Sequence, residues 1–177
     1  MKKWLKWILL TLLLAATVHL AAVWAYPYVI LAVVSRKAGQ RTGLGLNQAY
    51  HAEPTTPDQR TVVMPSPDLI YSLIRYDVSQ TPILITAAVP AETYWSLSFY
   101  ASNTDNFFTL NDRQTKTNPV RILLVGPDTP RPSGGQETVV VSPSSKGVVL
   151  ARILIKDEAQ IGQLVEIQKK MTCRSVK

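Results

Sequence analysis

Residues 94–101 read Tyr-Trp-Ser-Leu-Ser-Phe-Tyr-Ala, and this stretch indicates the fold class of the chain. Its side chains alternate between two kinds, which is the period of two that a half-buried β-strand shows. We expect one kind to face the core: Trp95, Leu97, Phe99 and Ala101. The other kind, Tyr94, Ser96, Ser98 and Tyr100, forms either a plain solvent-exposed face or a recognition surface, since Tyr and Ser are frequent at binding surfaces.

Eight short β-rich runs occupy most of the chain beyond residue 60, and Pro, Gly, Asn and Asp separate them. They span residues 61–64, 69–78, 83–89, 94–101, 107–110, 121–125, 137–141 and 148–155. Residues 157–171 instead place apolar side chains at helical spacing, with acids first and Lys last, which suits the helix dipole. The pattern predicts a mainly β protein, an antiparallel β-sandwich with one C-terminal amphipathic helix.

The N-terminal segment has a different character. From Trp7 to Val34 there are 28 residues without a charged side chain. Trp prefers the membrane interface, and Trp4 and Trp24 are separated by about 30 Å of helix, the thickness of the hydrocarbon core. We therefore expect a single transmembrane helix near residues 5–25, with a kink at Pro27. The predicted organisation is a membrane anchor over residues 1–37, a linker over 38–60, and an extracytoplasmic domain over 61–177.

Charge predicts the orientation of this anchor. Lys2, Lys3 and Lys6 precede the span, so the positive-inside rule places the N-terminus in the cytoplasm. The expected location is the bacterial inner membrane, single-pass, with the domain in the periplasm. A cleaved signal peptide is the competing interpretation, with Val23-Trp24-Ala25 before the cut. The bulky Trp24 and the apolar run beyond it favour an uncleaved anchor.

Composition excludes several classes of protein. The chain has 177 residues, 46% of them apolar and 18% charged, which is too apolar for disorder. One cysteine excludes a disulfide framework, a Cys-rich zinc module and an iron–sulfur cluster. The net charge of +7 belongs to the N-terminal segment, because residues 38–177 carry 14 basic and 12 acidic side chains. That placement argues for a membrane and against nucleic acid as partner.

Arg152 is the unusual residue of the last predicted strand. In residues 148–155 one face carries only apolar side chains, and the other sets Arg152 among Val148, Leu150 and Leu154. Such an Arg either pairs with a carboxylate or extends its charge to a rim. Asp68 and Asp77 are the leading candidates for a carboxylate partner.

Several motifs occur in a fixed order over residues 50–171. The run Val62 to Ser72 contains a Pro-Ser-Pro-Asp step followed by Leu-Ile-Tyr-Ser, and a Val-Gly-Pro turn and an Arg before the final strand come later. This order resembles the bacterial domain of unknown function 1254, although Ser66 stands where the family usually has Asn. The motif positions carried over are Pro65, Pro67, Asp68, Tyr71, Gly126, Pro127 and Arg152. The resemblance implies an extracytoplasmic β-sandwich, usually followed in the same chain by a domain of unknown function 1214, and it implies no established activity.

Three classes of function remain open. The sequence favours a structural or interaction module that works with another envelope protein. The second class is a domain that binds a small molecule or glycan on the face of Tyr94, Ser96, Ser98 and Tyr100. The third is a carboxylate-based hydrolase that uses Asp68 with Asp77 or Asp105.

The sequence offers little catalytic chemistry. A Ser-His-Asp triad would need His51, which falls in the predicted linker, and there is no Gly-x-Ser-x-Gly motif. We therefore expect no catalytic residue, no cofactor and no metal site, and regard an enzyme as the less favoured class. The expected partners are the membrane and a second membrane-tethered protein of the 1214 type, since related chains usually append that domain, with self-association as the lesser alternative.

Overall fold

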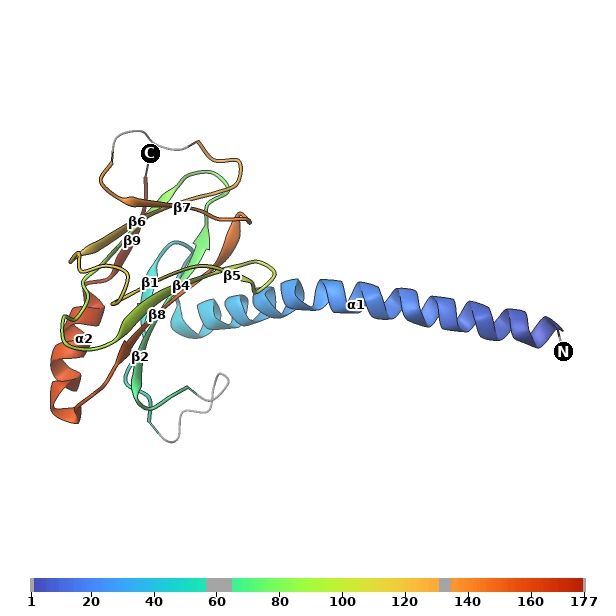
Figure 1. Cartoon of the computed structure of the whole chain (residues 1–177), viewed down its shortest axis with the longest axis horizontal. Coiled ribbons are helices and arrows are strands. Elements are labelled where there is room, and N and C mark those ends of the chain that lie inside the picture. The colour runs from blue at the N-terminus through green and yellow to red at the C-terminus, as the bar shows by residue number, and fades with distance from the viewer. Residues whose placement is uncertain (1, 57–64, 131–134, 177) are drawn as a thin grey trace.

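Two β-sheets pack face to face, and a long N-terminal helix extends from them (Figure 1). The computed structural model describes residues 2–56, 65–130 and 135–176. Sheet A has the strand order β1-β2-β8-β4-β5, and sheet B has the order β7-β6-β3-β9. The strands are β1 Ala49–His51, β2 Leu69–Asp77, β3 Ile83–Ala87, β4 Trp95–Ala101, β5 Asn106–Asn111, β6 Val120–Val125, β7 Thr138–Val141, β8 Lys146–Leu154 and β9 Thr172–Ser175.

This arrangement confirms the predicted β-sandwich. Every strand pair among the described residues is antiparallel except β6 with β7, which is parallel. Seven of the eight predicted runs correspond to β2 through β8. The eighth, residues 61–64, lies outside the described residues.

The core lies between the two sheets and follows from the alternation of side chains. In β2 and β8 every second residue is buried, as the period of two requires. The four side chains predicted to face the core from β4 are all buried: Trp95, Leu97, Phe99 and Ala101. Phe99 meets the ring of Phe108 edge-on, with 5.4 Å between ring centroids.

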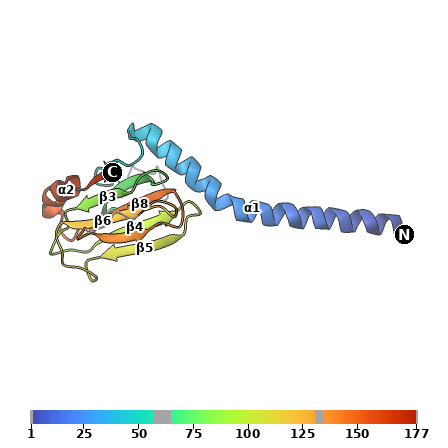
Figure 2. The ribbon, with the colours of Figure 1, turned by 90° about the horizontal axis from the view of Figure 1, so that it is seen from above.

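Helix α1 spans Lys2–Thr42 and includes Pro27. Its axis changes direction partway along (Figure 2). By length and composition it can cross a membrane, and its apolar side chains are largely exposed. The helix extends beyond the predicted anchor boundary at residue 37, so residues 38–60, expected as a linker, contain its last turns and also β1.

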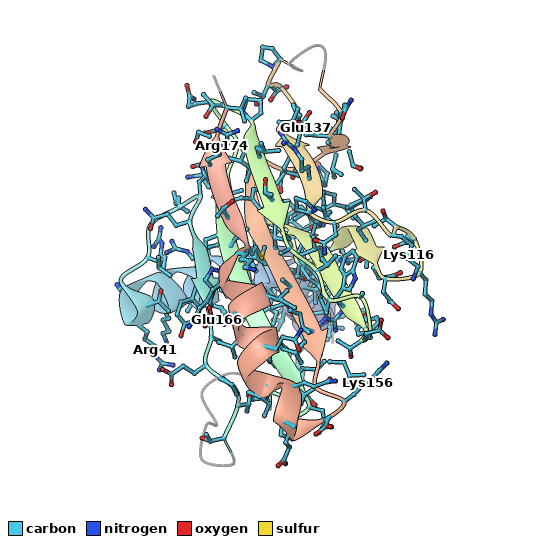
Figure 3. The ribbon with its side chains drawn as sticks, turned by 90° about the vertical axis from the view of Figure 1, so that its left-hand side faces the viewer. Arg41, Lys116, Glu137, Lys156, Glu166 and Arg174 are labelled. Atoms are coloured by element: carbon cyan, nitrogen blue, oxygen red, sulfur yellow. The ribbon has the colours of Figure 1, made fainter. Side chains whose placement is uncertain are left out.

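Helix α2, Ile161–Lys169, follows a single 3-10 turn at Glu158–Gln160 and is the predicted C-terminal amphipathic helix. Asp157 accepts a hydrogen bond from the Ala159 amide and so caps the turn. Leu164 and Gln168 are the buried residues of α2. Figure 3 shows α2 in front of the strands, with the side chains of Lys116 and Lys156 directed away from the ribbon.

Candidate functional site

Sheet A turns one face toward sheet B and the other away from it, and we call the second its outer face. Alternating burial and strand register place three strands' side chains there: Tyr71, Leu73 and Arg75 of β2, Val148, Leu150, Arg152 and Leu154 of β8, and Ser96, Ser98 and Tyr100 of β4. The residues from β2 and β8 are all half-buried. A solvated sheet face normally alternates to polar side chains, whereas this one carries Leu, Val, Tyr and Arg.

The two serines of this face are buried, which contradicts plain solvent exposure. Ser96 is 1% exposed and Ser98 is 2% exposed, while Tyr94 and Tyr100 are half-buried. A serine side chain is short, and the register places Arg152 and Asn111 beside Ser96, and Leu150 and Thr109 beside Ser98. The sequence pattern located these side chains on one face and could not show what lies over them.

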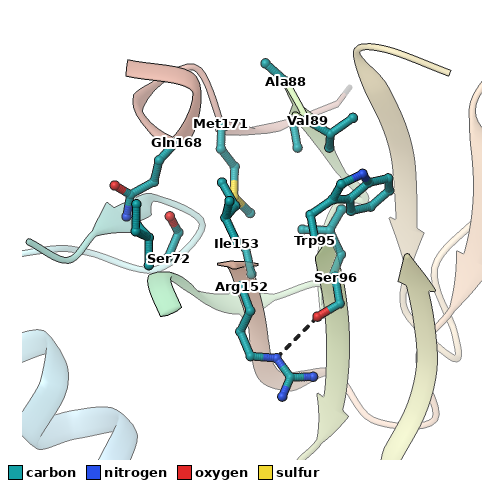
Figure 4. A pocket seen from close by; sticks show the side chains of 13 residues that line it. Ser72, Ala88, Val89, Trp95, Ser96, Arg152, Ile153, Gln168 and Met171 are labelled. Atoms are coloured by element: carbon teal, nitrogen blue, oxygen red, sulfur yellow. Dashed lines mark hydrogen bonds between the residues drawn. The ribbon is translucent and has the colours of Figure 1, made fainter. Parts of the chain in front are cut away.

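Arg152 lies between Tyr71 on β2 and Ser96 on β4 in the strand register. Its Nε donates to Ser96 Oγ at 3.2 Å, and its Nη2 reaches Ser98 Oγ at 3.4 Å. In Figure 4 the side chain of Arg152 points away from Met171 and Trp95, toward the outer face. Two neutral hydroxyls therefore hold the guanidinium of Arg152 beside the serine pair.

The predicted carboxylate partner of Arg152 is wrong for both candidates. Asp68 is exposed at the entry to β2, and Asp77 pairs with Lys146 at 3.2 Å. The ion pairs of the described residues are Arg121–Glu137, Lys146–Asp77 and Lys169–Glu166, and none includes Arg152. The reason is register, because β8 places Arg152 opposite Tyr71 and Ser96 rather than opposite an acid.

Tyr71 joins the first sequence motif to this site. Its phenolic oxygen accepts a hydrogen bond from the Ser66 amide at 3.0 Å, which holds the turn at residues 65–68. Ser66 also receives the Leu69 amide on its carbonyl at 3.3 Å. Pro65, Pro67 and Asp68 are therefore parts of a turn, while Tyr71 and Arg152 share a row of the outer face.

Arg75, the second arginine of the outer face, fixes helix α1 to sheet A. Its Nε donates to Ser35 Oγ at 2.9 Å and its Nη1 to the Leu44 carbonyl at 3.2 Å. Gly39 is buried where α1 approaches Arg75, and a Cβ there would collide with the guanidinium. Sequence reasoning missed this contact, since nothing local marks Arg75 as the partner of a helix forty residues earlier.

The loop after α1 strengthens the same attachment. Asn47 adopts a left-handed φ of 59°, and its side chain donates to the Asp77 carbonyl at 2.9 Å while accepting the Asp77 amide at 2.8 Å. The Asn47 amide also donates to the Arg75 carbonyl at 2.8 Å. Asn tolerates the left-handed region better than most residues, so this position was a recognisable turn signal.

The Val-Gly-Pro motif lies elsewhere and has a structural role. A Cβ on Gly126 would lie 2.5 Å from the Val78 carbonyl oxygen, so the close approach of two backbones requires glycine. Thr129 Oγ1 donates to the same carbonyl at 2.7 Å. Gly126 and Pro127 therefore shape a turn, and the structure does not bring them to the outer face.

Two of the hollows among the described residues bear on function. One, of about 20 Å³, is lined from both sheets and α2 and has room for about one water. The other is an open groove of about 580 Å³ at the start of β6 and β7. Its polar lining includes Gln114, Thr115, Thr117, Gln136 and Thr138.

The titratable groups show no paired-carboxylate arrangement around Asp68 and Asp77. These two residues flank β2 at opposite ends, roughly 30 Å apart at about 3.3 Å per residue. Burial alone would raise the pKa of Asp77, but hydrogen bonds from Ser79 and Lys146 hold that pKa below its usual value. The carboxyl is therefore ionised, which does not suit the general acid of a glycosidase.

His51 and Cys173 both face inward from edge strands. His51 lies in β1, where its Nδ1 is 3.1 Å from Ser72 Oγ, and burial lowers its pKa. Cys173 lies in β9 opposite Ile85, and burial raises the pKa of its thiol to about 12. Such a thiol is almost entirely protonated and therefore unreactive at neutral pH.

Comparisons with solved structures show the same fold. A protein from Vibrio parahaemolyticus, VPA0106, is 13% identical, and the match has a TM-score of 0.71 over 88% of this chain and 37% of that one. A putative uncharacterized protein from Burkholderia cenocepacia is 14% identical, with a TM-score of 0.53 over 86% of this chain and 40% of that one. The chain thus spans about two fifths of the length of these relatives.

No curated protein matches the chain. The model of one family, described as a protein of unknown function, DUF1254, matches residues 46–175. That range includes β1 through β9, the turn held by Tyr71, and the row of Tyr71, Arg152 and Ser96. On this match over most of its length, the chain belongs to the DUF1254 family.

Proposed function

We propose that the chain is a membrane-anchored interaction module, whose sandwich domain lies in the periplasm and docks with a second envelope protein. The observation that carries this proposal is the outer face of sheet A, with its half-buried Tyr, Leu, Val and Arg side chains. Tyr and Arg are over-represented among the residues that dominate binding energy at protein interfaces. The hollow between the two sheets and α2, by contrast, has room for about one water.

The anchor supports the same role. Helix α1 is long and apolar enough to cross a membrane, and its basic N-terminus favours a cytoplasmic start in the bacterial inner membrane. Confining two proteins to one membrane raises their effective concentration, so a modest interface suffices. The resemblance set out above makes a membrane-tethered protein of the 1214 type the first partner to test.

The test of the complex is crosslinking in intact membranes after co-expression with such a protein. We expect a crosslinked product that contains both chains. A product of twice the mass of this chain would indicate self-association instead. A strictly monomeric product would remove the proposed function.

The topology has its own test, and the neighbours Thr172 and Cys173 provide a matched pair. Thr172 is exposed and Cys173 half-buried on adjacent positions of β9. In a Cys173→Ala background, Thr172→Cys should react with a membrane-impermeant maleimide in intact spheroplasts. The native Cys173 should react only after unfolding, because its thiol pKa is about 12. Labelling of Thr172→Cys only after lysis would place the domain in the cytoplasm.

The groove at the start of β6 and β7 favours a second candidate function. Its amide and hydroxyl side chains are suited to a polar ligand such as a glycan. Binding would appear as a rise in melting temperature with an added oligosaccharide. The rise should be absent in Gln114→Ala if this groove is responsible.

A further inference from the structure

The row of Tyr71, Arg152 and Ser96 on the outer face is rich in hydrogen-bond donors. Ser96 Oγ accepts from Arg152 Nε, and among the described residues its own hydroxyl proton has no acceptor. Tyr71 likewise accepts from the Ser66 amide, and no acceptor for its phenolic proton occurs in the same ranges. The Nη1 of Arg152 has no hydrogen-bond partner there either. Each of these groups can donate to an incoming group.

A charged guanidinium in a half-buried position needs compensation that neutral hydroxyls supply only in part. Eleven of the twelve acidic residues of the chain lie within the described ranges, and none of the eleven pairs with Arg152. The chemical complement of a planar fork of donors is a group with two acceptor oxygens, and a carboxylate satisfies it with two parallel hydrogen bonds. The site is therefore built for an acceptor anion that these parts of the chain do not supply.

Arg75, the other arginine of the outer face, shows how a packed segment of polypeptide can supply the hydrogen-bond acceptors that such an arginine needs. Arg75 is satisfied by a hydroxyl and a carbonyl of the helix and loop packed on it, from Ser35 and Leu44. Arg152 lies four residues along β8 from Val148, the residue opposite Arg75, so roughly 13 Å separates the two rows. Half-buried Leu150 and Leu154 border Arg152 on its own strand and supply apolar area for a second packed element.

We propose that a surface element of the partner protein packs on this part of the outer face and places an Asp or Glu carboxylate on Arg152, between Tyr71 and Ser96. This inference rests on the proposed function and names the residue on which the interface is centred. The hollow that Ser96 and Arg152 help to line has room for about one water, so a small acid does not fit inside it, and the half-buried Leu150 and Leu154 favour a polypeptide that packs on the face. Charge complementarity sets the chemistry of the partner.

The experiment uses the full chain in its own membranes, with the photo-crosslinking residue p-benzoylphenylalanine in place of Tyr94. Tyr94 is half-buried, and its carbonyl accepts the Leu154 amide, so it lies beside the Arg152 row. We expect irradiation to give one protein adduct whose crosslinked peptide adjoins an Asp or Glu. Arg152→Gln should lower the adduct yield about tenfold or more, because one partner of an interfacial charge pair is lost. Arg152→Lys, which keeps the charge without the fork, should give an intermediate yield.

Matched controls separate this inference from the proposed function. Arg121→Gln removes an exposed arginine of sheet B and should leave the Tyr94 adduct unchanged. The same photo-crosslinker at Val139, an exposed residue of β7, reports on sheet B. Adducts from Val139 alone would leave the interaction module standing and remove the Arg152 site. No adduct from either position would remove both.

Exchanging the charges of Arg152 and the partner acid tests whether the two side chains pair directly. Arg152→Glu should abolish the adduct, and changing the identified partner acid to Arg should restore it. Failure of that rescue overturns the proposal, as does an adduct with lipid only. Asp58 is the one acid outside the described residues, so Asp58→Asn is run in parallel. If it reproduces the loss seen with Arg152→Gln, the carboxylate belongs to this chain and the inference fails.

Discussion

Arg152 donates a hydrogen bond to Ser96, and the free energy of unfolding of variants at the two positions measures how strongly they are coupled. Arg152→Met leaves the buried Ser96 hydroxyl without its partner, which typically costs about 1 to 3 kcal/mol. Ser96→Ala in the same background removes the orphaned hydroxyl and should recover part of that loss. Denaturant unfolding of the detergent-solubilised chain measures the stability of the native protein and of both variants. A larger loss, of about 3 to 5 kcal/mol, would instead be that of a broken buried ion pair.

His51 makes stability depend on mildly acidic pH. Burial is the main cause of its lowered pKa, with the charge of Lys169 acting in the same direction and a hydrogen bond to the Met171 backbone opposing them. Because the folded pKa lies below the ordinary value of 6.5, the unfolded chain takes up the proton first as the pH falls. Stability should therefore fall as pH drops from 6.5 toward the folded pKa.

The measurement for His51 is the melting temperature across that pH window in the native chain and in His51→Gln. The native chain should lose melting temperature on acidification, and the variant should lose less. The pKa of Asp77 is below its usual value, so that carboxyl titrates in a more acidic range and does not contribute to the change of melting temperature in this window. Identical pH slopes for both proteins would exclude His51 as the responsible group.

At the scale of single residues, the sequence predicted the face of a strand on which a side chain lies better than it predicted what surrounds that side chain. The alternation in β4 correctly separated Trp95 and Phe99 from Ser96 and Ser98. It could not predict that the serines are buried, because burial depends on the side chains that the strand register places beside them, including Arg152 and Leu150 of β8. The same limit explains Arg152, whose neighbours follow from a register that local patterns do not specify.

The attachment of α1 to sheet A leads to a prediction at the scale of the element. Gly39→Leu places a side chain against the Arg75 guanidinium and should break its bonds to Ser35 and Leu44. Two lost hydrogen bonds correspond to about 1 to 3 kcal/mol, so amide hydrogens of residues 31–47 should exchange about tenfold faster or more. Hydrogen exchange by mass spectrometry measures this locally. Gln40→Leu, the same change at the exposed neighbouring position, should leave the exchange unaltered.

Strands with a strong alternating pattern were predictable, and the weak edge strands were not. β2, β4 and β8 form the middle of sheet A, and their alternation indicated them directly. β1 has three residues and β9 four, and both lie at sheet edges, where one side lacks a strand partner. Their formation depends on the neighbouring strand rather than on their own sequence, so the pattern did not reveal them.

At the scale of the whole molecule, the family motifs acquire two different meanings. Gly126 serves packing, since it permits the close approach of its backbone to the Val78 carbonyl. Tyr71 and Arg152 come from opposite ends of the domain sequence and meet on one row of sheet A. Long-range strand pairing creates that meeting, which is why the sequence alone predicted the fold class and left the site open.

The bonds of Arg75 and Asn47 make the last turns of α1 part of the domain rather than a tether to it. In a membrane, the domain would then neither swivel nor tumble independently of its span. Its search for a partner would reduce to lateral drift and to rotation about the membrane normal. In the proposed membrane-anchored form, every copy would present the same side of sheet A at the same height above the lipid, so encounters with the proposed partner would begin already aligned.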